Sequence, residues 1–174
     1  LSPVEVRARD VPPAQVEAPL ATPEQQAFTT AGVNEANFRQ ALRERGLAVI
    51  VVRNATSRDD ADRPQPYNLR VPGGVQQIGS AGTVYDIAHF QVVQADQLRG
   101  LGGTSNPRPG RRVLPRFLHE PAALAFNPPH PTGPAGSSRI HADGSVAMAV
   151  PAQRALSWQQ THPDGTPVVR ERFW

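Results

Sequence analysis

The sequence predicts a mainly β protein with one or two short helices: a small antiparallel β-sandwich-like domain with long Pro/Gly-rich loops and an extended N-terminal arm. Three observations lead to this fold class. Residues 137–174 contain two segments that alternate around Asp-Gly turns, a pattern typical of β-hairpins. There are 19 Pro and 14 Gly, which favours short strands joined by loops. Hydrophobic residues make up 39% of the chain and aromatic residues 6%, so we expect a modest core.

Residues 1–23 form the predicted arm, because their prolines remove backbone donors and restrict the residue before each of them. We expect residues 24–174 to form a single β-rich domain. Its predicted parts are a helical start at 24–45, a long loop at 100–136 and the C-terminal hairpins at 137–174.

Two helices are expected in the helical start. Thr22 is placed to cap the first helix, and Asn34 the second, which ends before Gly46. Residues 47–52, LAVIVV, follow at once. This continuous β-branched run predicts a strand buried on both faces.

Short strands are also expected at residues 67–71, 75–79 and 83–95. The last of these alternates, so Phe90 and Val92 share one face and the residues between them share the other. We therefore predict a two-faced strand.

The loop at 100–136 is dominated by Gly, Pro, Asn and Arg, and we expect it to contain one short strand at 113–118 and one helical turn at 121–125. Loops this long are usually functional or wrap a partner. The two hairpins that follow are predicted to turn at Asp143-Gly144 and at the HPDG segment, residues 162–165.

Composition excludes several classes of function. All 18 basic residues are Arg, they are scattered, and the net charge is only +3, so we expect no nucleic-acid partner. The absence of Cys excludes disulfides, cysteine-based zinc sites and covalent c-type haem attachment within this chain. No apolar run reaches about 18 residues, so no membrane span is predicted. No Ser–His–Asp set can be argued from spacing, so we do not expect this chain alone to be an enzyme.

Two histidines are candidates for a place next to a haem or a metal. His89 and His119 are both flanked by apolar residues, and a neutral imidazole there could bind iron. The alternative for each is an ordinary surface or loop histidine. The other three histidines, His130, His141 and His162, are interpreted in that second way.

The acidic segment SRDDADR contains the candidate calcium ligands. Asp59, Asp60 and Asp62 are spaced so that their carboxylates could hold Ca²⁺. The alternative is that Arg58 and Arg63 neutralise the same carboxylates.

Most of the chain from about residue 45 resembles the middle region of large exported bacterial proteins related to the hydrazine synthase alpha subunit. The most specific segment is DGSVAMAVPAQRALSWQQTHPDGTPVVRERFW, residues 143–174. The resemblance implies an architecture of β-propeller, β-rich middle domain and c-type haem-binding segment, in a periplasmic or extracellular protein. The family's haem-attaching cysteines have no counterpart here, and hydrazine synthesis does not follow from the likeness.

The resemblance leads to two expectations about function. The first is a non-catalytic scaffold of an exported, c-type cytochrome-like redox protein, beside a haem-binding segment outside this chain and in contact with a propeller domain or other subunits. Trp174 would then mark the edge of a fragment whose longer form continues towards a Cys-x-x-Cys-His site. The alternative is a structural or interaction subunit of an extracytoplasmic multiprotein assembly.

Overall fold

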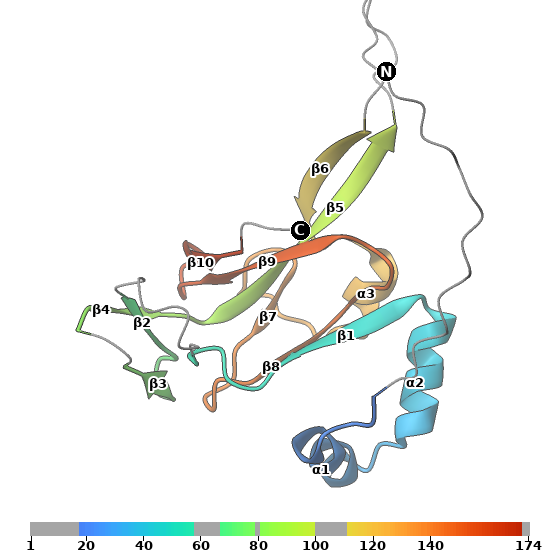
Figure 1. The fold of residues 1–174 in the computed structure, drawn as a ribbon, viewed down its shortest axis with the longest axis horizontal. Coiled ribbons are helices and arrows are strands. Elements are labelled where there is room, and N and C mark those ends of the chain that lie inside the picture. Colours follow the sequence, from blue (N-terminus) through green and yellow to red (C-terminus); the bar gives the residue numbers. More distant parts are fainter. Residues whose placement is uncertain (1–17, 58–66, 79–80, 100–110, 172–174) are drawn as a thin grey trace, which may run out of the picture. The chain divides into compact units, whose positions relative to one another are not determined.

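The computed structural model describes residues 18–57, 67–78, 81–99 and 111–171. Within them lie ten strands and three helices, so the predicted mainly β fold is confirmed (Figure 1). The chain divides into two compact units, residues 1–39 and 40–174. No helix in the described ranges is long and apolar enough to cross a bilayer.

The first helix, α1 (Thr22–Ala31), begins inside the range predicted to be an extended arm. Its N-cap is Ala21 without a side-chain cap, so the predicted capping role of Thr22 is wrong by one position. Pro in the first turn already lacks the donor that a cap would satisfy. The second helix, α2 (Glu35–Glu44), has the predicted cap, since the backbone N–H of Asn37 donates to Oδ1 of Asn34 at 3.0 Å.

Strand β1 (Leu47–Val52) pairs with β8 (Val146–Pro151) in a two-stranded antiparallel sheet, with Leu47 opposite Pro151. The prediction that β1 is buried on both faces is wrong, because Val51 is 51% exposed. A β-branched run predicts a strand but does not distinguish a two-stranded ribbon from the centre of a large sheet.

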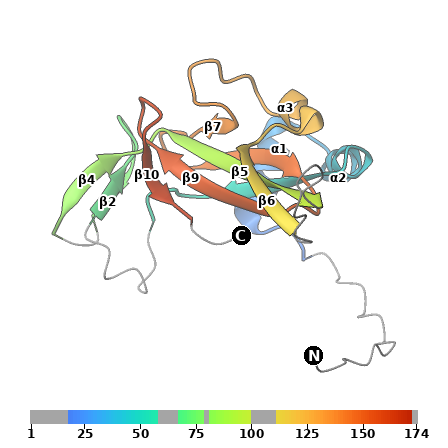
Figure 2. The same cartoon turned by 90° about the horizontal axis from the view of Figure 1, so that it is seen from above.

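The larger sheet has the order β10–β9–β5–β6, and β7 also pairs with β5. Strand β5 is its centre, with β9 along one edge and β7 followed by β6 along the other (Figure 2). All of these pairings are antiparallel. The strands are β5 (His89–Arg99), β6 (Arg111–Phe117), β7 (Ser137–Arg139), β9 (Leu156–Thr161) and β10 (Pro167–Arg170).

A small third sheet has the order β3–β2–β4, and its β2–β4 pair is parallel. The strand predicted at 83–95 is therefore two strands, β4 and β5, separated at Ile87 and Ala88. The backbone N–H of Ile87 donates to the carbonyl of Arg70 instead, at 2.8 Å. The strands of this sheet are β2 (Tyr67–Arg70), β3 (Gln76–Gln77) and β4 (Thr83–Asp86).

The predicted short strand and helical turn of the long loop are both present, as β6 and as α3 (Pro121–Phe126). The hairpin predicted around Asp143-Gly144 is wrong in its pairing. The chain does turn there, but β7 pairs with β5 and β8 pairs with β1. The turn therefore connects two sheets. The second predicted hairpin is confirmed, since β9 and β10 pair directly.

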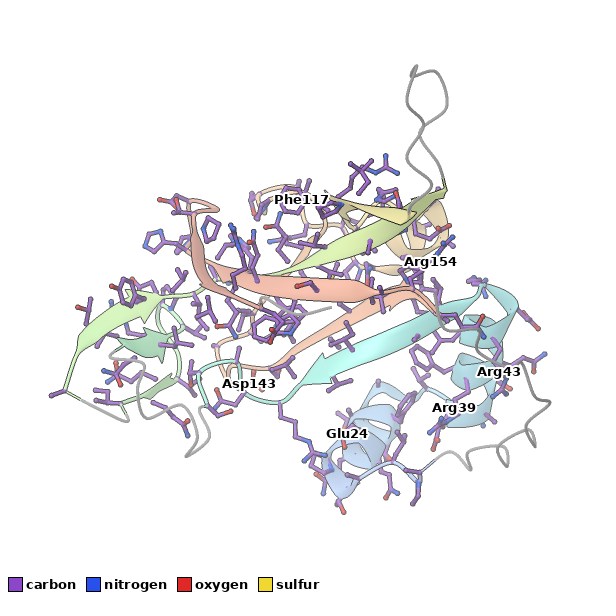
Figure 3. All side chains as sticks on the ribbon, turned by 45° about the horizontal axis from the view of Figure 1, so that its top comes forward. Glu24, Arg39, Arg43, Phe117, Asp143 and Arg154 are labelled. Atoms are coloured by element: carbon purple, nitrogen blue, oxygen red, sulfur yellow. The ribbon has the colours of Figure 1, made fainter. Side chains whose placement is uncertain are left out.

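The core lies between the β1–β8 ribbon and the inner face of the five-stranded sheet (Figure 3). Phe90 and Val92 project from β5 to this side, as their alternation predicts, and are 3% and 0% exposed. Met148 and Val150 of β8 belong to the same buried cluster. Trp158 stacks on Phe90 with ring centroids 5.5 Å apart. The inner face is thus closed, which leaves the outer face of the sheet as the surface to consider for function.

Candidate functional site

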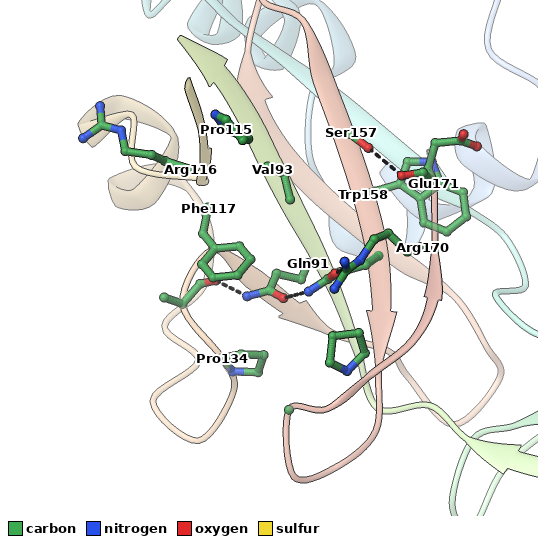
Figure 4. Close-up of a pocket in the computed structure, with 14 residues that line it drawn as sticks. Gln91, Val93, Pro115, Arg116, Phe117, Pro134, Ser157, Trp158, Arg170 and Glu171 are labelled. Atoms are coloured by element: carbon green, nitrogen blue, oxygen red, sulfur yellow. Dashed lines mark hydrogen bonds between the residues drawn. The ribbon is translucent and has the colours of Figure 1, made fainter. Parts of the chain in front are cut away.

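The outer face of the five-stranded sheet carries a groove of about 910 Å³ (Figure 4). Its floor and walls come from β5, β6, β9 and β10, together with the loop that contains Pro134 and Ala135. Volumes of roughly 300–1,000 Å³ are usual for ligand sites in proteins.

Strand register arranges the groove side chains in two parallel rows, because directly opposed residues project to the same face. The first row runs across β6, β5 and β9 as Phe117, Val93 and Ser157. It has an apolar end at Phe117, which is 47% exposed. The second row is polar. It runs across β5, β9 and β10 as Gln91, Gln159 and Arg170.

A β-bulge in β10 places Arg170 in the groove. The β9–β10 register shifts between Pro167 and Val169, so Arg170 lies opposite Gln159. Without the extra residue, continuous pairing from Pro167 opposite Thr161 would set Arg170 opposite Trp158, on the core side. The bulge therefore directs this guanidinium to the outer face.

The polar row is joined by hydrogen bonds that all run in one direction. Arg170 Nε donates to Oε1 of Gln159 at 3.0 Å, and the Gln159 amide donates to Oε1 of Gln91. Gln91 Nε2 then donates to the carbonyl of Ala135 at 2.7 Å. Gln91 and Gln159 are 2% and 5% exposed. Because buried amides are costly unless paired, this chain of bonds fixes the floor of the groove.

The direction of these bonds decides which polar groups the groove offers to a ligand. Both glutamine side-chain oxygens accept a hydrogen bond from within the row. Available to a ligand are the two Nη groups of Arg170, the second hydrogen of each amide and the second lone pair of each amide oxygen. No described carboxylate forms an ion pair with Arg170. Glu171 also lines the groove, but its carboxylate points away from the row of Gln91 in Figure 4, so the polar end of the groove carries the positive charge of Arg170.

Arg116 does not add to this charge. It precedes Phe117 in β6, so its side chain projects to the other face of the sheet, away from the row of Gln91 in Figure 4. There Arg116 Nη2 lies 2.6 Å from Oδ2 of Asp96. Hydrogen bonding to Arg116 is the main cause that lowers the pKa of Asp96.

The predicted candidate His119 belongs to this ion pair and not to the groove. Its Nδ1 lies 2.9 Å from the carbonyl of Phe117, and its Nε2 lies 2.7 Å from Arg116 and 3.1 Å from Asp96. Both ring nitrogens are therefore engaged. To bind iron, His119 would have to break one of these contacts.

The predicted candidate His89 lies on the groove face of β5, one row before Gln91. It is 6% exposed, and its Nδ1 lies 3.1 Å from Oγ1 of Thr161 on β9. Burial is the main cause that lowers its pKa, and the neighbouring imidazole of His130 adds to the effect.

His130, interpreted from sequence as an ordinary loop residue, packs on His89 with ring centroids 5.1 Å apart. Gly133 makes this possible, because a Cβ there would lie 2.2 Å from the His130 ring. The loop with His130 and Ala135 is thus held at two points over β5. Both imidazoles line a second cavity of about 240 Å³.

The calcium candidates Asp59, Asp60 and Asp62 lie outside the described residues. In the described ranges, no three His, Asp or Glu side chains gather closely enough to hold a metal.

Sequence reasoning missed the groove residues. One usable signal was present: glutamines at 91 and 159 interrupt runs that otherwise look like ordinary strands, HFQVV and LSWQQ. A polar residue in a strand at the centre of a sheet needs a partner, so paired glutamines suggest a cross-strand network. The sequence does not indicate that Arg170 faces the groove, because this orientation depends on the β-bulge in β10.

Comparison with known proteins adds no family. No protein-family model matches the chain, and neither a curated protein nor a solved structure is significantly similar to it. The resemblance described above therefore stays a prediction.

Proposed function

We propose that this chain is a non-catalytic scaffold whose outer-face groove receives a neighbouring segment of an exported redox assembly. The observation that carries the proposal is the groove itself. The row that ends at the exposed Phe117 and the polar row that ends at Arg170 lie side by side on one face, while the opposite face is closed by the core. A fixed floor beside an exposed aromatic side chain suits docking, because little conformational entropy is lost when a partner binds.

The redox part of the proposal comes from the family resemblance. When bound, a c-type haem would supply electron transfer. The groove offers no axial ligand, since no histidine lines it; His119 uses both ring nitrogens within the chain, and His89 is 6% exposed with its Nδ1 at 3.1 Å from Thr161. In this proposal the haem-binding segment lies outside the chain, and the role of the scaffold is to pack against it. The setting would be periplasmic or extracellular.

A second candidate is a structural subunit of an extracytoplasmic assembly without a haem nearby. Strand β6 favours this alternative, because it ends the order of the five-stranded sheet and exposes two apolar side chains. Leu114 is 45% exposed and Phe117 is 47% exposed. Exposed apolar side chains on a terminal strand are a common basis for protein contacts.

The intact polypeptide that contains these residues tests the redox proposal. We expect an intact mass well above 18.8 kDa together with Soret absorbance in the polypeptide or its complex. A mass of 18.8 kDa and no haem absorbance in the purified complex would leave only the second candidate.

Docking is tested separately by substitution in the same complex. Phe117→Ser should lower the stability of the complex by about tenfold, the effect of losing one well-packed aromatic contact. Leu124→Ser is the matched control, since Leu124 is 49% exposed on α3 and does not line the groove. Equal complex stability in the two variants would contradict docking at the groove.

A further inference from the structure

We infer that the groove recognises an extended peptide segment with a carboxylate and an apolar side chain on the same side, the carboxylate binding Arg170 and the apolar group packing on Phe117. This inference rests on the proposed docking function and adds the chemistry of the partner. Three observations carry it: the free donors of Arg170, the direction of the glutamine bonds, and the separation of the two ends of the groove.

The guanidinium is oriented for a carboxylate. Its Nε is held by Gln159 at 3.0 Å, which fixes the plane of the group and leaves the two Nη groups available. Two parallel N–H donors match the two oxygens of a carboxylate. Arg170 is exposed and has no ion pair with any described acidic residue, so its charge is available to a partner.

The charge of Arg170 at the end of the glutamine row selects against a cationic partner. Oε1 of Gln91 and Oε1 of Gln159 are already hydrogen-bonded. An ammonium or guanidinium group in the groove would be repelled by the Arg170 charge. A carboxylate, or a peptide carbonyl beside it, would meet donors.

One free cation suits a carboxylate better than a multiply charged ligand. Arg116 is already paired with Asp96 and projects to the other face. A phosphate or a nucleic acid usually meets several basic side chains, and Arg170 is the one cationic side chain among the described groove residues that points into it.

The length of the groove suggests an extended segment. Phe117 on β6 and Arg170 on β10 are three strand spacings apart across the sheet, about 14 Å, and one row apart along the strands, about 7 Å, so about 16 Å separates them. Residues of an extended chain project to the same side only at even spacings, and a spacing of four, about 13 Å, comes nearest to this distance. The fitting segment therefore has an acidic residue about four positions from an apolar one.

A pair of probe peptides tests this on the 174-residue chain by NMR titration. The first is acetyl-Leu-Thr-Ser-Thr-Asp-amide, and the second has Asn in place of Asp. We expect the Asp peptide to shift the amide signals around both Phe117 and Arg170, and the Asn peptide to bind about tenfold more weakly, a difference of ~1.4 kcal/mol.

Substitutions at Arg170 test whether this residue causes the preference for the Asp peptide. Arg170→Gln should abolish the preference for Asp over Asn, and Arg170→Lys should keep part of it because the charge remains. Arg154→Gln is the matched control, since Arg154 is an exposed arginine in the β8–β9 turn that does not line the groove. It should leave both affinities unchanged.

The outcomes distinguish docking at the groove from recognition of a carboxylate by Arg170. If both peptides bind the groove equally, carboxylate recognition is wrong and docking survives. If acetate alone reproduces the shifts at Arg170 and the Asp peptide adds none at Phe117, the two-point segment is wrong. If neither peptide shifts any groove residue, this inference is overturned and docking loses its support in the isolated chain.

Discussion

Gln91 and Gln159 face each other across β5 and β9, and the amide of Gln159 donates to the side-chain oxygen of Gln91 where both are nearly excluded from solvent. This pair connects the loop carbonyl of Ala135 at one end to Arg170 at the other. It therefore fixes both the floor of the groove and the position of its cation.

Gln91→Ala should destabilise the fold by about 1–3 kcal/mol, because the Gln159 amide and the Ala135 carbonyl both lose their partner. Urea unfolding at neutral pH measures this. Gln77→Ala, at an exposed position of β3, should change stability by about 0.5 kcal/mol or less. If the two variants are equally stable, the row is not structural.

The same substitution should destabilise the fold far more at Phe90 than at Phe117. Phe90→Ala should cost about 3–5 kcal/mol, because Phe90 is 3% exposed and stacks on Trp158. Phe117→Ala should cost about 0.5 kcal/mol or less in the isolated chain, since its side chain is half exposed. A large loss of stability for Phe117→Ala would mean that Phe117 supports the fold and is not kept for a partner.

Stability should fall as the pH drops below about 7 because of His89. Burial lowers the pKa of His89 in the folded state below its ordinary value of 6.5, so the unfolded chain takes up this proton first as pH falls. The contribution is complete well above pH 6.5 and is lost as the pH falls through 6.5 towards the lower pKa of the folded state. Thermal melting from pH 8 to pH 5 measures the slope.

The His89→Gln variant should melt with a flatter pH profile over this range than the unsubstituted chain. His141→Gln, at an exposed histidine, serves as control and should keep the original slope. The surroundings of His89 include His130, His162 and Arg139, so the readout is the difference between the two variants. An unchanged slope in His89→Gln would contradict the assignment.

Gly144→Ala should destabilise the fold more than Gly73→Ala. Both glycines have a positive φ, +83° and +73°, and an alanine there costs about 1 kcal/mol. At Gly144 the new Cβ would also lie 2.4 Å from Oδ1 of Asn54, whereas at Gly73 nothing lies within 4 Å. Chemical denaturation compares the two, and equal losses would show that the contact with Asn54 relaxes freely.

Elements that are determined by residues close together in the chain could be predicted from the sequence. The cap at Asn34 and the β9–β10 hairpin depend on residues close to each other in the chain. The strand and helix inside the loop at 100–136 are local in the same sense, and both are present as β6 and α3.

Features that depend on distant partners could not be predicted. The sequence around Gly144 is typical of a hairpin, but β7 before the turn pairs with β5 and β8 after the turn pairs with β1. The pairing of His130 with His89 requires the loop to fold back onto β5. The β-bulge in β10 shifts its pairing with β9 by one residue and so places Arg170 on the outer face. The sequence of β10 does not indicate whether this bulge or continuous pairing is adopted.

Site-specific photocrosslinking in the intact assembly tests the central claim, that a partner segment occupies the groove. A photoreactive phenylalanine analogue replaces Phe117 in one sample and Leu124 in the other, and crosslinked peptides are sequenced by mass spectrometry. We predict that position 117 crosslinks to one peptide with an acidic residue about four positions from an apolar one, and that position 124 does not. Crosslinks at 117 that are absent, or no more frequent or specific than those at 124, would contradict the claim.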